Sequence, residues 1–157
     1  MKQAIASLLW LALCAGAQAF SGVVVRVTDG DTLWLRPDDG GRAVKVRMEG
    51  IDAPERCQPW GPQAKAALAS RVLNQHVQVK QRAYDDYQRV IGGLWMNGED
   101  IAAWMVREGH AWSYRYRRSL GPYAAEEQQA RAARRGLFAA PAMEPREFRK
   151  SHGPCDP

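Results

Sequence analysis

Apolar and polar residues alternate in the first third of the chain, which predicts a set of short β-strands. Residues 23–27 form a β-branched run typical of a strand, and an Asp-Gly-Asp turn follows at 29–31. Residues 32–36 alternate in the same way, and residues 44–48 place apolar side chains on one face and basic ones on the other. The Pro-, Asp- and Gly-rich segment 37–41 between them is typical of a hairpin loop.

After residue 61 the apolar residues shift to the spacing of an amphipathic helix. A Gly-Pro pair precedes this stretch, which we expect to be helical over residues 63–74. The same criteria predict the elements that follow: strands at 77–80 and 90–96, then helices at 100–108 and 124–135, each helix followed by a glycine. The segment from Pro141 onward is rich in proline and charge, and it predicts an extended tail.

This order of elements belongs to the α+β class. A strand meander with a helix after its third strand fits a small closed barrel of the oligonucleotide-binding (OB) type, although other α+β folds share the order. The chain has 157 residues, of which 46% are hydrophobic, enough for one packed core. No internal repeat or linker divides it, so we expect one domain over residues 20–139 and a tail over 140–157.

The first 19 residues have the organisation of a secretory signal peptide. A positive start at Lys2 precedes an apolar run over residues 4–15, and Ala17-Gln18-Ala19 is a small-x-small cleavage sequence. The apolar run is shorter than the roughly 20 residues that a membrane-spanning helix needs. We therefore expect a periplasmic or secreted protein without a membrane attachment after cleavage; a buried first helix is the alternative interpretation.

Two cysteines, Cys57 and Cys155, remain after cleavage. Export places them in an oxidising compartment where thiols pair, so a disulfide between them is predicted. This bond would hold the tail beside the loop that leaves Glu55. Two alternatives stay open, namely two free thiols or a bond from Cys155 to another molecule. The expected assembly is a monomer without a protein partner.

Charge and acidic clusters add the first chemical signal. The formal net charge of +5 favours polyanionic partners such as DNA and RNA, although many small proteins are mildly basic. Acidic residues gather at 29–31, at 52–55 and at 85–86. Taken singly, these are an ordinary turn, a proline-containing loop and a solvated charge run. Together with neighbouring arginines, they supply the cation site, phosphate contacts and water-activating carboxylate that phosphodiester hydrolysis requires.

These segments carry a resemblance to a known family. Val-Thr-Asp-Gly-Asp-Thr at 27–32, Val-Arg-Met-Glu-Gly-Ile-Asp-Ala-Pro-Glu at 46–55 and Asp-Tyr-Gln-Arg at 86–89 follow one another as in the staphylococcal nuclease (thermonuclease) family. The chain resembles that family over residues 22–138. The resemblance implies a five-stranded OB-type barrel with about three α-helices packed on it. It also implies a Ca²⁺-dependent nuclease that cleaves DNA and RNA and leaves 3′-phosphate ends.

The resemblance also assigns candidate site residues. Arg47 and Arg89 would hold the phosphate, because a guanidinium is always charged and offers paired donors. Glu55 would accept a proton from the attacking water. The Ca²⁺ ligands would be Asp31, Asp52 and the backbone carbonyl of Ala53.

Two positions depart from the family pattern. Ala53 stands where Thr is common, so a hydroxyl contact is lost while the carbonyl ligand survives. Gln88 stands where Gly is usual, directly before Arg89. If that turn requires a positive φ, Gln88 is strained and the position of Arg89 is affected.

A substrate surface is predicted at Tyr114, Arg115, Tyr116 and Arg117, where aromatic side chains alternate with basic ones. Aromatic rings stack on bases, and arginines follow the phosphate backbone. Trp112, just before this stretch, is at least as good a candidate for the core.

Two other functions compete with the nuclease. An inactive OB barrel could bind nucleic acid without cleaving it, but it would not need the combined set Asp31, Arg47, Asp52, Glu55 and Arg89. A calcium-stabilised structural protein of the envelope is disfavoured by the two arginines, because cations beside a cation site weaken metal binding unless an anion joins them.

Overall fold

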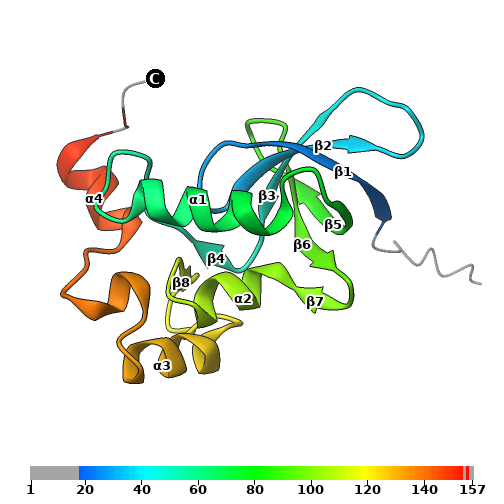
Figure 1. Cartoon of the computed structure of the whole chain (residues 1–157). Coiled ribbons are helices and arrows are strands. Elements are labelled where there is room, and N and C mark those ends of the chain that lie inside the picture. The colour runs from blue at the N-terminus through cyan, green and yellow to red at the C-terminus, as the bar shows by residue number, and fades with distance from the viewer. Residues whose placement is uncertain (1–17, 154, 156–157) are drawn as a thin grey trace, which may run out of the picture.

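The computed structural model describes residues 18–153 and 155. Five strands close into a barrel: hydrogen-bonded neighbours follow the order β3-β2-β1-β5-β6, and a parallel pairing of β3 with β6 completes the circle (Figure 1). These strands are β1 (Ala19–Val27), β2 (Thr32–Pro37), β3 (Val44–Met48), β5 (His76–Tyr84) and β6 (Val90–Met96). The predicted α+β fold with an OB-type barrel is therefore confirmed.

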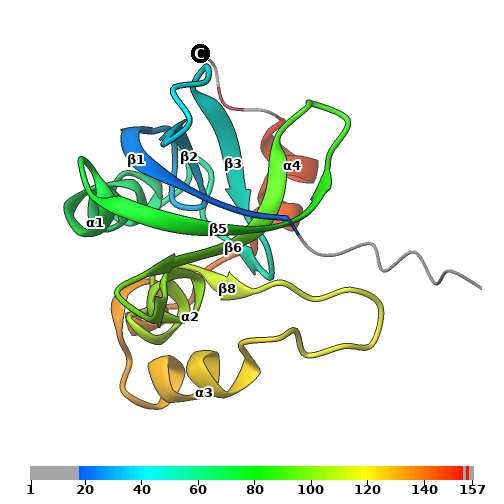
Figure 2. The same cartoon turned by 90° about the vertical axis from the view of Figure 1, so that its right-hand side faces the viewer.

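Short strands and helices complete the fold. Strand β4 (Ile51–Asp52) pairs with β8 (Trp112–Ser113), and β7 (Glu99–Asp100) pairs with β6. The helices are α1 (Gly61–Val72), α2 (Ile101–Arg107), α3 (Ala124–Ala132), the 3-10 turn η1 (Gly136–Ala139) and α4 (Pro145–His152). Figure 2 shows α2 beside the barrel strands and α3 beyond it. In the part of the chain that the structure describes, no helix is both long and apolar enough to cross a membrane.

Most predicted elements form close to the expected residues. Strand β6 has the predicted bounds, and α1 begins two residues earlier than expected because Pro62 is tolerated in its first turn. The predicted signal peptide lies almost entirely outside the described residues. Its last residue, Ala19, begins β1 and pairs with Lys80 of β5.

The prediction of an extended tail after Pro141 is wrong, because α4 forms within it. Pro145 occupies the first turn, where its missing N–H is not needed, and Gly153 ends the helix with a φ of 73°. Phe148 is buried and anchors the helix on the domain. One aromatic side chain in eight residues gives no apolar periodicity, so tertiary packing determines this helix.

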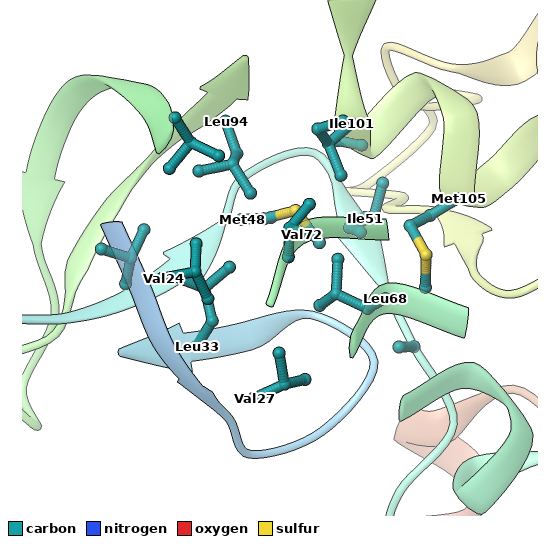
Figure 3. Packing of buried hydrophobic residues seen from close by; sticks show 14 of the residues in the cluster. Val24, Val27, Leu33, Met48, Ile51, Leu68, Val72, Leu94, Ile101 and Met105 are labelled. Carbon is teal, nitrogen blue, oxygen red and sulfur yellow. The ribbon is translucent and has the colours of Figure 1, made fainter. Parts of the chain in front are cut away.

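Aliphatic side chains from the strands, α1 and α2 fill the barrel (Figure 3). The same packing brings two site segments together at Gly30. A Cβ at Gly30 would lie 2.7 Å from the Cβ of Ala53 and 2.9 Å from that of Ala64, so only glycine permits this approach. The turn that carries Asp31 therefore contacts the segment that follows β4.

Candidate active site

One cleft gathers most of the predicted site residues. It has a volume of about 640 Å³ and is lined by the β1–β2 turn, the end of β3, the segment after β4, the β5–β6 loop and α4. Its lining includes six residues that the sequence singled out: Asp31, Arg47, Ala53, Glu55, Arg89 and Tyr114. Segments that are distant in the sequence thus meet at one edge of the barrel.

Arg47, at the end of β3, joins the two carboxylate-bearing segments. The register that places Thr32 opposite Arg47 brings the arginine beside Asp31. Nη1 of Arg47 donates to Oδ1 of Asp31 at 2.8 Å, and Nη2 donates to Oδ1 of Asp52 at 3.2 Å. Asp31 is 3% exposed and Asp52 is 6% exposed. A single guanidinium therefore neutralises part of the charge of two buried carboxylates.

Acidic side chains remain crowded around this arginine. Burial and the neighbouring charge of Asp31 raise the pKa of Asp29 to about 7. The same two causes raise the pKa of Asp52, although the charges of Arg149 and Arg47 act in the opposite direction. The carboxylates are thus not fully compensated by the protein's own cations, and a bound cation would favour their ionised forms.

The candidate cation ligands lie in adjoining segments. The backbone N–H of Ala53 donates to Oδ2 of Asp31 at 3.1 Å, which fixes the segment after β4 against the turn. Among residues 18–153 and 155, no group of three or more His, Cys, Asp or Glu side chains is arranged to hold a metal ion. The predicted set differs from such a group because it consists of two carboxylates and one backbone carbonyl. Its oxygen donors and buried negative charge fit a hard cation such as Ca²⁺.

Glu55 has a partner that the sequence did not reveal. Nη1 of Arg149 donates to Oε1 of Glu55 at 2.5 Å, and Nη2 of the same arginine donates to Oδ2 of Asp52 at 3.3 Å. Arg149 lies on α4, in the segment predicted to be an extended tail. The one signal in the sequence was indirect: a disulfide between Cys57 and Cys155 places the tail beside Glu55.

Arg89 is held by its own loop. Its Nε donates to Oδ2 of Asp85 at 2.6 Å, and its backbone N–H donates to Oδ1 of the same carboxylate at 2.9 Å. Among the described residues, its guanidinium donates to no other side chain, so the terminal nitrogens stay available in the cleft. Gln88 has a φ of 57°, so the turn does use the left-handed conformation that favours glycine.

The predicted substrate surface divides between exposed and paired residues. Tyr114 lines the cleft, and Tyr116 is exposed with the guanidinium of Arg117 over its ring. Arg115 donates to Oε1 of Glu127 at 2.5 Å and to Oε1 of Glu144 at 2.6 Å, and it would have to break these pairs to reach a phosphate. Trp112 is 2% exposed and belongs to the core, the alternative that the sequence left open.

The predicted disulfide is confirmed. Cys57 and Cys155 are bonded, with their Cα atoms 5.6 Å apart and a sequence separation of 98. Cys57 lies two residues after Glu55, so the bond attaches the end of the chain to the loop that carries this carboxylate.

Comparisons with known proteins agree with this geometry. The family model described as "Staphylococcal nuclease homologue" matches residues 45–140. Protein ParB of Escherichia coli is 39% identical over 96% of this chain and 91% of its own length. A micrococcal nuclease of Shigella flexneri is 36% identical over 95% of this chain and 92% of its own length. An uncharacterized endonuclease of Haemophilus influenzae is 33% identical over 81% of this chain and 71% of its own length.

Proposed function

The chain belongs to the staphylococcal nuclease homologue family, and we propose on that premise that it is a calcium-dependent nuclease of DNA and RNA that leaves 3′-phosphate ends. The observation that carries the proposal is the shared cleft of Arg47, Glu55 and Arg89, next to buried carboxylates that lack full compensation. A phosphodiester placed there would meet the guanidinium groups of Arg47 and Arg89 and the carboxylate of Glu55. The expected site of action is the periplasm or the medium.

Asp31, Asp52 and the backbone carbonyl of Ala53 would hold the Ca²⁺ ion. When bound, the ion supplies positive charge that offsets the phosphate and lowers the barrier to attack by an oxygen nucleophile. The support for this assignment is the arrangement of the oxygen donors: Asp31 and Asp52 are buried carboxylates, and the backbone N–H of Ala53 donates to Asp31, so the candidate ligands adjoin.

The two arginines would stabilise the charge that develops on the phosphate. Attack on phosphorus gives a five-coordinate arrangement with more negative charge on its oxygens, and guanidinium donors that are already in place lower its energy. Arg47 is held by Asp31 and Asp52, and Arg89 by Asp85, and the N–H groups that these contacts leave free would bind the phosphate.

Glu55 would act as the general base. Its carboxylate takes a proton from water as the water oxygen bonds to phosphorus, and the bond from phosphorus to the 5′ oxygen breaks. The departing 5′ oxygen takes up a proton from solvent, Glu55 releases its proton to solvent, and the phosphate remains on the 3′ side. A positioned base of this kind contributes roughly 10²- to 10⁴-fold in rate.

The substrate would extend from the cleft along Tyr114, Tyr116 and Arg117. Tyr114 lines the cleft itself, and the exposed ring of Tyr116 is available for stacking on an unpaired base. Arg115 is the weaker member of this predicted surface because of its two ion pairs.

The test is incubation of the mature protein with plasmid and single-stranded DNA, with Ca²⁺ and with a chelator. We expect cleavage only with Ca²⁺ and products that carry 3′-phosphates. Glu55→Gln should lower the rate by roughly 10²-fold or more at unchanged Tm. Cleavage that continues in chelator would refute the calcium requirement, and DNA binding without any cleavage would favour a binding-only barrel.

A further inference from the structure

The C-terminal helix α4 contributes a further arginine to the cleft. Arg149 lies beyond residue 140, where the match to the family model ends, yet it lines the same cleft as Arg47 and Arg89. Figure 1 shows α4 next to the segment that connects β4 to α1, and the ion pair of Arg149 with Glu55 joins them. The guanidinium bridges Glu55 and Asp52, which belong to that segment and to β4.

Contacts at both ends hold α4 in this place. Before the helix, Nε2 of Gln58 donates to the carbonyl of Met143 at 2.7 Å, and Arg115 pairs with Glu144. After the helix, Cys155 is bonded to Cys57. Between these points Phe148, the neighbour of Arg149, is buried. The helix is therefore attached to the loop that carries Glu55 and packed against the domain.

Glu55 depends on this helix for its orientation. Among the described residues, Arg149 is the one side chain that donates a hydrogen bond to the Glu55 carboxylate. A glutamate side chain has several rotatable bonds, and ordering it costs up to about 2 kcal/mol of conformational entropy. A base that rotates freely spends less time within reach of the attacking water. A partner that holds one carboxylate oxygen leaves the other available to accept the proton.

We propose that Arg149 is a positioning residue that holds the Glu55 carboxylate toward Asp52, and that the Cys57–Cys155 disulfide keeps α4 where this contact forms. The proposal rests on the proposed nuclease function, because it concerns the base of that reaction. It assigns a part of the active site to a segment outside the match to the family model.

Steady-state cleavage of single-stranded DNA at saturating Ca²⁺ tests whether Arg149 positions Glu55. Arg149→Gln should lower kcat about tenfold and leave KM within about twofold, because the base is misplaced while the phosphate contacts remain. Arg149→Lys should recover part of kcat, since an ammonium can pair with Glu55 but cannot bridge two carboxylates. Arg146→Gln removes the same charge from an exposed position of α4 and should cleave at the wild-type rate. Tm is measured for each variant to separate misplacement from unfolding.

The disulfide is tested with a double-mutant cycle. Replacing both cysteines by serine should lower kcat in the wild-type background and change nothing further in the Arg149→Gln background. Independent, multiplying effects would contradict the role of the disulfide as the tether of Arg149.

Other outcomes overturn the proposal in distinguishable ways. A faster Arg149→Gln enzyme that needs less Ca²⁺ would show that Arg149 blocks the cation site. A raised KM with unchanged kcat would show that it binds substrate. A wild-type rate of the Arg149→Gln enzyme would show that Arg149 does not contribute to catalysis. Wild-type protein without Ca²⁺-dependent cleavage would instead refute the proposed function itself.

Discussion

Arg47 and Arg89 face the same cleft but are held in different ways. Arg47 comes from a barrel strand and bonds to carboxylates 16 and 5 residues away in sequence. Arg89 bonds to Asp85, four residues earlier in its own loop. The barrel as a whole therefore positions Arg47, whereas one turn positions Arg89.

The surroundings of the two arginines also differ in burial and strain. Arg47 bonds to the buried carboxylates of Asp31 and Asp52, and the pKa values of Asp52 and of the half-buried Asp29 are raised, so any change there alters the energy of buried charge. Arg89 lies in an exposed loop in which Gln88 adopts a left-handed conformation. The proposed phosphate contacts thus come from two kinds of segment, a barrel strand among buried carboxylates and a local loop. The two should respond differently to substitution.

The largest effect is expected at Arg47. Arg47→Lys should lower kcat by roughly 10²- to 10³-fold, because a point charge cannot bond to both carboxylates and also present a planar fork to phosphate. Steady-state kinetics on single-stranded DNA measure this effect, with the exposed Arg42→Lys as the matched control. A folded Arg47→Lys enzyme that keeps its rate would remove Arg47 from the site.

The carboxylates around Arg47 should also make stability depend on pH. Folding raises the pKa of Asp29 from 3.8 to about 7, so the folded state holds this proton more tightly than the unfolded state. The stabilising contribution is complete below pH 3.8 and is lost as the pH rises through about 7. In chelator, the free energy of unfolding should therefore fall across this window by an amount on the order of a few kcal/mol. Tm should fall with it.

Thermal melts of wild type and Asp29→Asn between pH 4 and 8 measure this dependence, with the window set by the shift at Asp29. The variant should show a much flatter profile, because its amide does not titrate. Parallel profiles for the two proteins would show that Asp29 is not the group responsible.

A smaller effect on activity is expected in the loop that carries Asp85 and Arg89. Asp85→Ala should lower kcat/KM about tenfold with little change in Tm, because Arg89 loses the carboxylate that orients it but no buried charge is exposed. Asp86→Ala, at the exposed neighbouring position, is the control and should behave as wild type. Equal rates for both variants would mean that Arg89 finds its position without Asp85.

The smallest effect is expected at Gln88. Gln88→Gly should raise the free energy of unfolding by up to about 1 kcal/mol, because glycine adopts a positive φ without a steric cost. Activity should stay similar, since Asp85 still holds Arg89. Gln88→Ala keeps the strain and should show no gain in Tm. A Gln88→Gly protein that folds but loses activity would indicate that the turn uses the glutamine side chain.

Much of the barrel and of the candidate site could be predicted from local sequence. Strand β6 and the helices α1, α2 and α3 follow from spacing, because each buries one periodic face against the core. Asp31, Arg47, Glu55 and Arg89 stand in short motifs whose residue types fit one reaction. Their convergence on one cleft follows from the closed barrel. The disulfide followed from arithmetic, since two cysteines remained for an oxidising compartment.

The sequence by itself therefore indicated the barrel, favoured the pairing of Cys57 with Cys155 and supplied the candidate chemistry, because each follows from local patterns or residue counts. Only the tertiary structure decided that α4 is a helix, that Arg149 bonds to Glu55 and that Arg115 is engaged in ion pairs. An isolated eight-residue helix is not stable in water, and its formation depends on Phe148 packing on the domain and on attachments at both ends. Arg149 bonds to residues 94 and 97 positions away, and Arg115 to residues 12 and 29 positions away, and no local pattern encodes these pairings.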